Sequence, residues 1–129
     1  MHKDFRVGQA NELIKESRVF DLHNCFDFSS LTISGAGVLI LTFKPNPSHG
    51  AGYSGVTLKA QSVDYLEISP RFASTTLCDV EEIGYKSRGD HDDNWLLNES
   101  QASPADDLFF RFNGGHYVRF HCEQATLIE

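Results

Sequence analysis

A C-terminal β-hairpin constrains the fold more than any other feature of this sequence. The turn residues Asn113-Gly114-Gly115 separate two stretches in which apolar and polar side chains alternate. Successive side chains of a strand point to opposite faces, so the loop length decides which residues share a face. A two-residue loop would set Leu108 against Arg119 and mix apolar with charged side chains. A three-residue loop pairs Leu108 with Phe120 instead, and its glycines supply the positive φ that such a loop needs.

This register sorts the hairpin into two faces. Leu108, Phe110, Phe112, Val118 and Phe120 form the apolar face. The opposite face carries Phe109, Arg111, Tyr117, Arg119 and His121. Arg and Tyr are residue types that anchor protein interfaces. Two interpretations are open: this polar face binds a partner, or it faces solvent and its arginines pair with the acidic insert of the same chain, at 87–107.

Period-two alternation predicts further strands. Apolar residues alternate with polar ones along 19–28. From Leu31 on, the apolar residues occupy the other set of alternate positions, as the insertion of one residue would cause. We therefore predict a β-bulge at Ser29-Ser30. A turn at Gly35-Ala36 would then set Ile33 beside Val38.

The remaining chain divides into short strands and two polar segments. The unbroken apolar run 38–43 predicts a strand covered on both faces. Two prolines and three glycines in 44–55 predict a loop. Further strands are expected at 56–60, 63–68 and 80–86.

One short helix is expected near the N-terminus, at 9–17, where Leu13 and Ile14 would pack on the sheet. With about seven strands and a β-rich core at 19–127, we predict one mainly β domain over 1–129. Its architecture would be an antiparallel β-sandwich or a partly closed barrel.

A polar insert spans 87–107 and holds the only Trp of the chain. Its length predicts a functional loop, local helix or disorder, with a helical turn possible at 95–101. The run Asp90-His91-Asp92-Asp93-Asn94 resembles a calcium loop only in part. Trp95 stands where such a loop needs glycine and Gln101 where it needs glutamate, so we interpret the run as a solvated acidic loop.

The chain carries 18 acidic against 11 basic residues, a net charge of -7. Negative charge repels phosphate backbones, so we expect no nucleic-acid partner. A macromolecular partner would be a basic protein, although acidity can also serve solubility alone. Open sheet edges make a homo-oligomer possible.

The three cysteines, Cys25, Cys78 and Cys122, have no paired spacing and are interpreted as buried free thiols in a reducing cytoplasm. The polar start lacks the apolar region of a signal peptide, and no apolar run reaches the ~20 residues of a membrane span. We expect a cytoplasmic protein without membrane contact.

No nucleotide-binding or nucleophile motif is present, and no cofactor is predicted. A metal-dependent enzyme built on His23, His121 and the aspartates 90, 92 and 93 is one hypothesis. A small-molecule binding domain with a cavity lined by some of the ten Phe residues is another.

The short N-terminal helix, the strand Val56-x-Leu58 leading to Val63, and the Phe-rich terminal hairpin resemble small bacterial β-rich proteins of unknown function. Those proteins belong to toxin-immunity families and mobile gene cassettes. The resemblance spans most of the chain and implies a non-enzymatic, immunity-like binding protein. It transfers no functional residue.

The first functional hypothesis is therefore a non-enzymatic protein-binding module. An exposed Trp beside leucines, surrounded by carboxylates, would combine an apolar anchor with electrostatic steering of a basic partner. The candidate partner-binding residues are Trp95, Leu96, Asp92, Asp93, Arg111, Tyr117, Arg119 and His121.

Overall fold

The computed structural model describes residues 1–72 and 79–129, which form an almost entirely β structure. The strands are β1 (His2–Lys3), β2 (Arg6–Val7), β3 (Glu12–Lys15), β4 (Arg18–Asp21), β5 (Phe26–Ser34), β6 (Val38–Pro45), β7 (Val56–Ile68), β8 (Val80–Lys86), β9 (Asp107–Phe112) and β10 (Tyr117–Ile128). Seven strands form one sheet in the order β5-β6-β7-β10-β9-β8, with β1 paired in parallel to β10. Strands β2, β3 and β4 form a second, smaller sheet.

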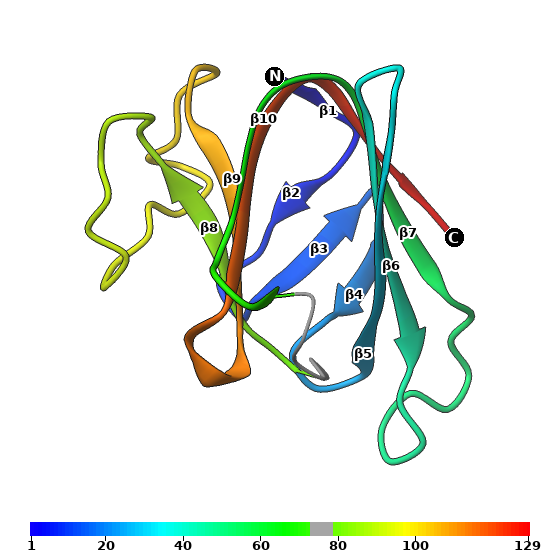
Figure 1. The fold of residues 1–129 in the computed structure, drawn as a ribbon. Helices are drawn as coiled ribbons and strands as arrows, with labels where there is room; N and C mark the ends of the chain where they lie inside the picture. The colour runs from blue at the N-terminus through cyan, green and yellow to red at the C-terminus, as the bar shows by residue number, and fades with distance from the viewer. Residues whose placement is uncertain (73–78) are drawn as a thin grey trace.

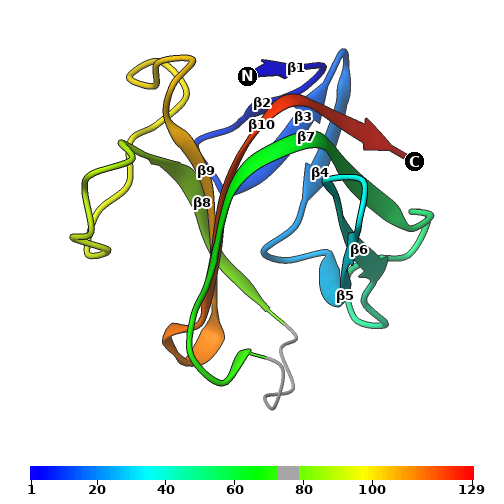
Figure 2. The same ribbon diagram turned by 45° about the horizontal axis from the view of Figure 1, so that its top comes forward.

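The two longest strands, β7 and β10, bend together into an arch (Figure 1). Their register shifts between His121 and Cys122, and Ser62 adopts a positive φ of 53° close to this shift. Such irregularities increase the local bend and twist of a strand pair. Strands β5 and β6 continue one leg of the arch, and β8 and β9 continue the other (Figure 2). The large sheet is therefore a half-barrel, and the small sheet lies beneath the arch.

Phenylalanine rings fill the space under the arch and join its two legs. Phe43 of β6 stacks on Phe110 of β9 with ring centres 6.1 Å apart, and Phe110 stacks on Phe120 of β10 with ring centres 6.4 Å apart. From β5, Phe28 reaches Phe112 of β9 at 4.9 Å. These contacts favour a packed aromatic core over the ligand cavity considered above, because the rings occupy one another's surroundings.

The terminal hairpin is confirmed in its predicted register. Phe110 pairs with Val118 and Leu108 with Phe120. A single 3-10 turn spans Asn113–Gly115, and both of its glycines have φ of 80°. The apolar face lies wholly in the core.

The helix predicted at 9–17 is wrong. This segment contains β3 and the tight turn that leads from it to β4, in which Glu16 has φ 55°. Leu13 pairs with Phe20, and both side chains are buried. A helix of two turns has little stability of its own, so alternate burial against the large sheet decides the local structure.

The first hairpin of the large sheet confirms the bulge but corrects the turn. The register shifts between Phe28 and Ser30, as predicted. The loop, however, contains three residues, 35–37, with Gly37 at φ 73°, and Ile33 pairs with Leu39, not with Val38. In β6 only alternate residues are fully buried, so the strand is covered completely on one face and partly on the other.

Two other predicted strands have different limits. The strand expected at 19–28 is interrupted by a turn in which Asp21 accepts hydrogen bonds from the backbone N–H groups of Asn24 and Cys25. The separate strands expected at 56–60 and 63–68 are one strand, β7. The strand at 80–86 is confirmed.

The described cysteines are free thiols, and Cys78 lies outside the described residues. Cys122 is buried, which raises its pKa to about 11, whereas Cys25 is only half-buried. The described part of the chain has no helix with the length and apolar character needed to cross a membrane.

Candidate binding cleft beside strand β8

Strand β8 ends the large sheet, so one of its edges has no neighbouring strand. Three groups from elsewhere in the chain cap this edge. The Asn11 side-chain oxygen accepts a hydrogen bond from the Ile83 N–H at 3.0 Å, and His23 Nδ1 donates to the Val80 carbonyl at 2.6 Å. Tyr85 exchanges two backbone hydrogen bonds with Leu97, at 3.0 and 2.9 Å. Capping of this kind keeps a sheet edge from pairing with other chains.

Asn11 reaches β8 because of its backbone conformation. It sits in the turn between β2 and β3 with φ of 58°, in the left-handed region that Asn adopts more readily than most residues. The turn is closed by a hydrogen bond from the Gly8 N–H to the Glu12 carbonyl. The small sheet thus places one side chain on the edge of the large one.

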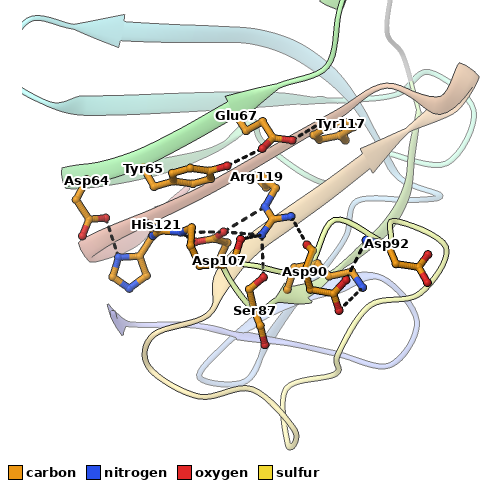
Figure 3. Close-up of polar contacts among 12 residues, drawn as sticks. Asp64, Tyr65, Glu67, Ser87, Asp90, Asp92, Asp107, Tyr117, Arg119 and His121 are labelled. Carbon is orange, nitrogen blue, oxygen red and sulfur yellow. Dashed lines mark hydrogen bonds and ion pairs between the residues drawn. The ribbon is translucent and has the colours of Figure 1, made fainter.

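The polar insert reaches the edge because Arg119 fixes its first half to the outer face of β10. Arg119 is fully buried and lies 2.8 Å from Asp107, which is also fully buried. Its guanidinium also donates to the carbonyl oxygens of Ser87, at 3.0 Å, and Asp90, at 2.8 Å (Figure 3). A buried arginine with this many acceptors acts as a structural anchor.

A second polar group lies beside this anchor. Glu67 accepts hydrogen bonds from the hydroxyls of Tyr65, at 2.5 Å, and Tyr117 (Figure 3). Burial opposes ionisation of Glu67, but the two phenol hydrogen bonds outweigh it and hold its pKa below the usual value. Burial and the Glu67 carboxylate raise the pKa of Tyr117 to about 12. These three side chains therefore stabilise one another.

The single tryptophan lies where the insert leaves the outer face. Trp95 is 45% exposed, and the Lys86 ammonium lies 3.4 Å from the centre of its ring. Lys86 is itself fully buried and forms an ion pair with Asp90 at 3.3 Å. The ring therefore covers a buried cation on one side and remains accessible elsewhere.

After Trp95 the insert crosses directly over β8. A Cβ atom added to Gly84 would lie 2.7 Å from the Leu96 Cβ and 2.8 Å from the Leu97 carbonyl. Only glycine permits so close an approach of the insert to the strand. The helical turn expected at 95–101 is not a helix: Leu97 forms a β-bridge to Tyr85, and a turn follows at Asn98.

A cleft of about 600 Å³ lies between the crossing insert, the β8 edge and the turn of the small sheet. Its apolar lining comes from Val7, Ile14, Ile83, Leu96 and Leu97. Its charged lining comes from Arg6, Glu12, Glu82 and Glu99. The cleft lining thus combines apolar side chains with an excess of carboxylates.

The three carboxylates of the cleft differ in their partners. Glu99 accepts hydrogen bonds from the Val7 N–H at 2.6 Å and the Tyr85 hydroxyl at 2.7 Å, and it pairs with Lys3 at 3.0 Å. Burial opposes its ionisation, but these contacts dominate and lower its pKa. Glu82 pairs with Arg111 at 3.2 Å. Glu12 has no cation partner among the described residues.

The eight sequence-predicted site residues fall into three groups. Leu96 lines the cleft, and Trp95 and the exposed Asp92 lie close to it in sequence. Arg111 binds Glu82 and the Asp93 carbonyl, so Arg111 and Asp93 join the insert to the sheet. The other three, Tyr117, Arg119 and His121, are committed to partners within the chain.

His121 contacts Asp64 at 2.8 Å and the Pro104 carbonyl at 3.0 Å. The polar face of the hairpin is therefore covered by the chain's own insert. Pairing of an arginine with a carboxylate of the insert is confirmed for Arg119, which binds Asp107. Arg111 pairs instead with Glu82 of β8, and the expectation that this face is turned to solvent is wrong, because Arg119 is fully buried.

Sequence reasoning missed four important residues of the cleft: Asn11, Glu12, Ile83 and Glu99. The first two fell within the expected helix, so their position beside β8 could not be foreseen. Ile83 was expected only as part of a strand. The residue type of Asn11 was the one available signal, because Asn tolerates the positive φ of a tight turn.

The residues of the metal hypothesis lie apart. His23 contacts Val80 at the start of β8. His121 lies near the other end of that strand, because the residue before it, Phe120, pairs with Leu108, which pairs with Tyr85. Asp90 and Asp92 accept hydrogen bonds from insert backbone N–H groups. Within residues 1–72 and 79–129, no three His, Cys, Asp or Glu side chains are placed to share a metal ion.

Comparison with known proteins leaves the cleft as the main guide to function. No known protein family, curated protein or solved structure matches this chain.

Proposed function

We propose that this protein is a non-enzymatic binding module that holds a basic segment of a partner protein in the cleft beside β8. The observation that carries the proposal is the composition of the cleft lining, five apolar side chains with three carboxylates and one arginine. Apolar lining supplies affinity through burial, and the charges select the sign of the partner's charge.

The partner's charge follows from that of the chain. The net charge of -7 attracts a basic protein over long distances, and Glu12 offers a carboxylate without a cation partner among the described residues. A partner lysine or arginine beside Glu12 would form an ion pair at little cost, because no existing pair has to be broken. Leu96 and Ile83 would bury the apolar side chains that flank this cation.

We expect the bound segment to be extended. The cleft is lined by residues of the β8 edge, of the small-sheet turn and of the crossing insert. The cap on the β8 edge prevents simple strand addition, so binding would rest on side chains. Specificity would then come from the spacing of one cation between apolar residues.

Trp95 provides the readout for a direct test, since it is the only Trp and lies next to the cleft residue Leu96. The probes are two peptides of about eight residues in which leucine alternates with lysine or with glutamate. The lysine peptide is expected to change Trp95 emission and to give a saturable isotherm by calorimetry. The glutamate peptide is expected to do neither.

Two variants separate the cleft from general electrostatics. Leu96→Asp should weaken lysine-peptide binding at least ~10-fold, which corresponds to about 1.4 kcal/mol. Glu12→Gln should weaken it more than Glu123→Gln, which removes the same charge from an exposed site on β10. Equal effects of the two glutamine variants, together with unchanged binding in Leu96→Asp, would show that the cleft is not the binding site.

A further inference from the structure

The other end of the large sheet is open. Strand β5 pairs only with β6, and no described residue pairs with its outer edge. Folded proteins protect such edges with charged residues, proline, a bulge or a covering segment. In β5 the charged Asp27 and the bulge near Ser29 are such devices, and beyond them residues 30–34 form a regular strand without charge or proline.

The open edge also lacks charge. Residues 28–43, which contain most of β5 and β6, include no Asp, Glu, Lys, Arg or His and no Pro. The uncharged stretch stands out in a chain of net charge -7. Two copies of this acidic chain repel each other least where they meet through an uncharged surface.

Apolar side chains accompany the unpaired backbone groups. Ile33 is 55% exposed although its cross-strand neighbour Leu39 is buried. It borders a shallow hollow of about 290 Å³ whose lining is mainly apolar, with Val38, Val63 and Leu66, and also includes Asp64, which pairs with His121. An exposed isoleucine beside a mainly apolar hollow and an open strand edge marks a surface suited to association.

We propose that a second copy of this chain pairs with β5, antiparallel and across a two-fold axis near Thr32. Strand addition would satisfy the outward-facing N–H and C=O groups of residues 30–34 and join the two large sheets into one. The proposal concerns a surface separate from the cleft and does not depend on the proposed function.

The two-fold register places compatible residues together. With the axis at Thr32, Leu31 of each copy faces Ile33 of the other copy, and the two Thr32 residues face each other. The charged residue nearest to this segment, Asp27, would lie near the second copy's glycine-containing turn 35–37 and not near another carboxylate. Pairing through β8 in the same way is prevented by its caps.

Light scattering coupled to size exclusion, and sedimentation, test the proposal on the full chain. The mass should rise from 14.5 kDa towards twice that value as the concentration increases from micromolar to millimolar. Ile33→Lys places a charge beside the axis in each copy and should abolish the dimer. Val19→Lys adds the same charge at a residue 43% exposed on the small sheet and should leave the dimer intact.

Circular dichroism and Trp95 emission would establish that both variants are folded. A wild-type chain that stays at 14.5 kDa throughout would overturn the proposal. So would a dimer that survives Ile33→Lys or is lost equally in Val19→Lys, because either result places the contact elsewhere.

Discussion

The two end strands of the large sheet differ in whether the backbone groups of their outer edges are capped. Strand β8 is capped by Asn11, His23 and Leu97, which come from three different segments. Strand β5 has no cap among the described residues and carries no charge over 30–34. The difference shows that edge protection here depends on distant parts of the chain, and that it is supplied at one edge only.

The largest effect is expected from the anchor that holds the insert over β8. Asp107→Ala removes one member of the fully buried pair with Arg119 and leaves a buried guanidinium without its carboxylate. Breaking such a pair costs roughly 3–5 kcal/mol of unfolding free energy. Urea unfolding measures this loss, and Trp95 emission should show that the insert has moved.

The double variant Asp107→Leu, Arg119→Leu provides the control. It removes both charges and should be more stable than Asp107→Ala, because no buried charge is left unpaired. If the single variant loses less than about 1 kcal/mol, the pair does not anchor the insert.

The second prediction concerns the crossing of the insert over β8. Gly84→Ala introduces a methyl group 2.7 Å from the Leu96 Cβ and should destabilise the protein by about 1–3 kcal/mol through overpacking. Gly89→Ala, in the same insert, meets no atom within 4 Å and should have little effect. Equal melting temperatures for the two variants would argue against a close crossing.

A third, smaller effect is expected from the Asn11 cap. Asn11→Gly keeps the positive φ accessible but leaves the Ile83 N–H without its acceptor, at a cost of about 1 kcal/mol. Amide exchange of Ile83 should become faster while that of Tyr85, bonded to Leu97, changes less. Unchanged exchange at Ile83 would mean that the side chain does not cap the edge.

The fourth prediction is a pH dependence from Glu99, which links the insert to β2 and to Tyr85. Its pKa is lower in the folded chain than in the unfolded chain. Its contribution to stability is therefore complete above the ordinary carboxyl pKa of 4.5 and is lost as the pH falls through the lower, folded value. Glu99→Gln should reduce stability near neutral pH, and the difference from wild type should shrink in acid. A difference that stays constant with pH would contradict this role.

The smallest effect is expected at the open edge. Ile33→Lys changes a residue that is 55% exposed and should alter the unfolding free energy of the dilute monomer by no more than about 0.5 kcal/mol. Chemical denaturation at micromolar concentration measures it. A large loss would show that Ile33 is needed for folding and not only for association.

Local patterns predicted the parts of the fold in which short-range chemistry decides the structure. The loop 113–115 and the bulge near Ser29 followed from side-chain alternation and from glycine. The segment 9–17 was predicted wrongly because Leu13 and Ile14 fit both a short helix and a strand. Burial of Leu13 against the large sheet decides between them, and that contact is distant in sequence.

The candidate site was predictable only in part for a similar reason. Trp95 and Leu96 stood out by residue type within a polar insert, and they do lie at or beside the cleft. Arg119 and Tyr117 stood out equally, but their partners Asp107 and Glu67 cover them. Whether Trp95 and Leu96 or Arg119 and Tyr117 stay accessible depends on the path of the insert. That path is set by contacts between residues distant in sequence, which local sequence patterns do not reveal.

Amide hydrogen exchange at two protein concentrations tests the contrast between the edges most directly. The Ile83 and Tyr85 amides of β8 should be protected equally at micromolar and millimolar concentration, because their acceptors belong to the same chain. The amides of residues 30–34 that face away from β6 should exchange rapidly when dilute and become protected when concentrated. Equal protection of both edges at both concentrations, or rapid exchange at Ile83 and Tyr85, would contradict the account.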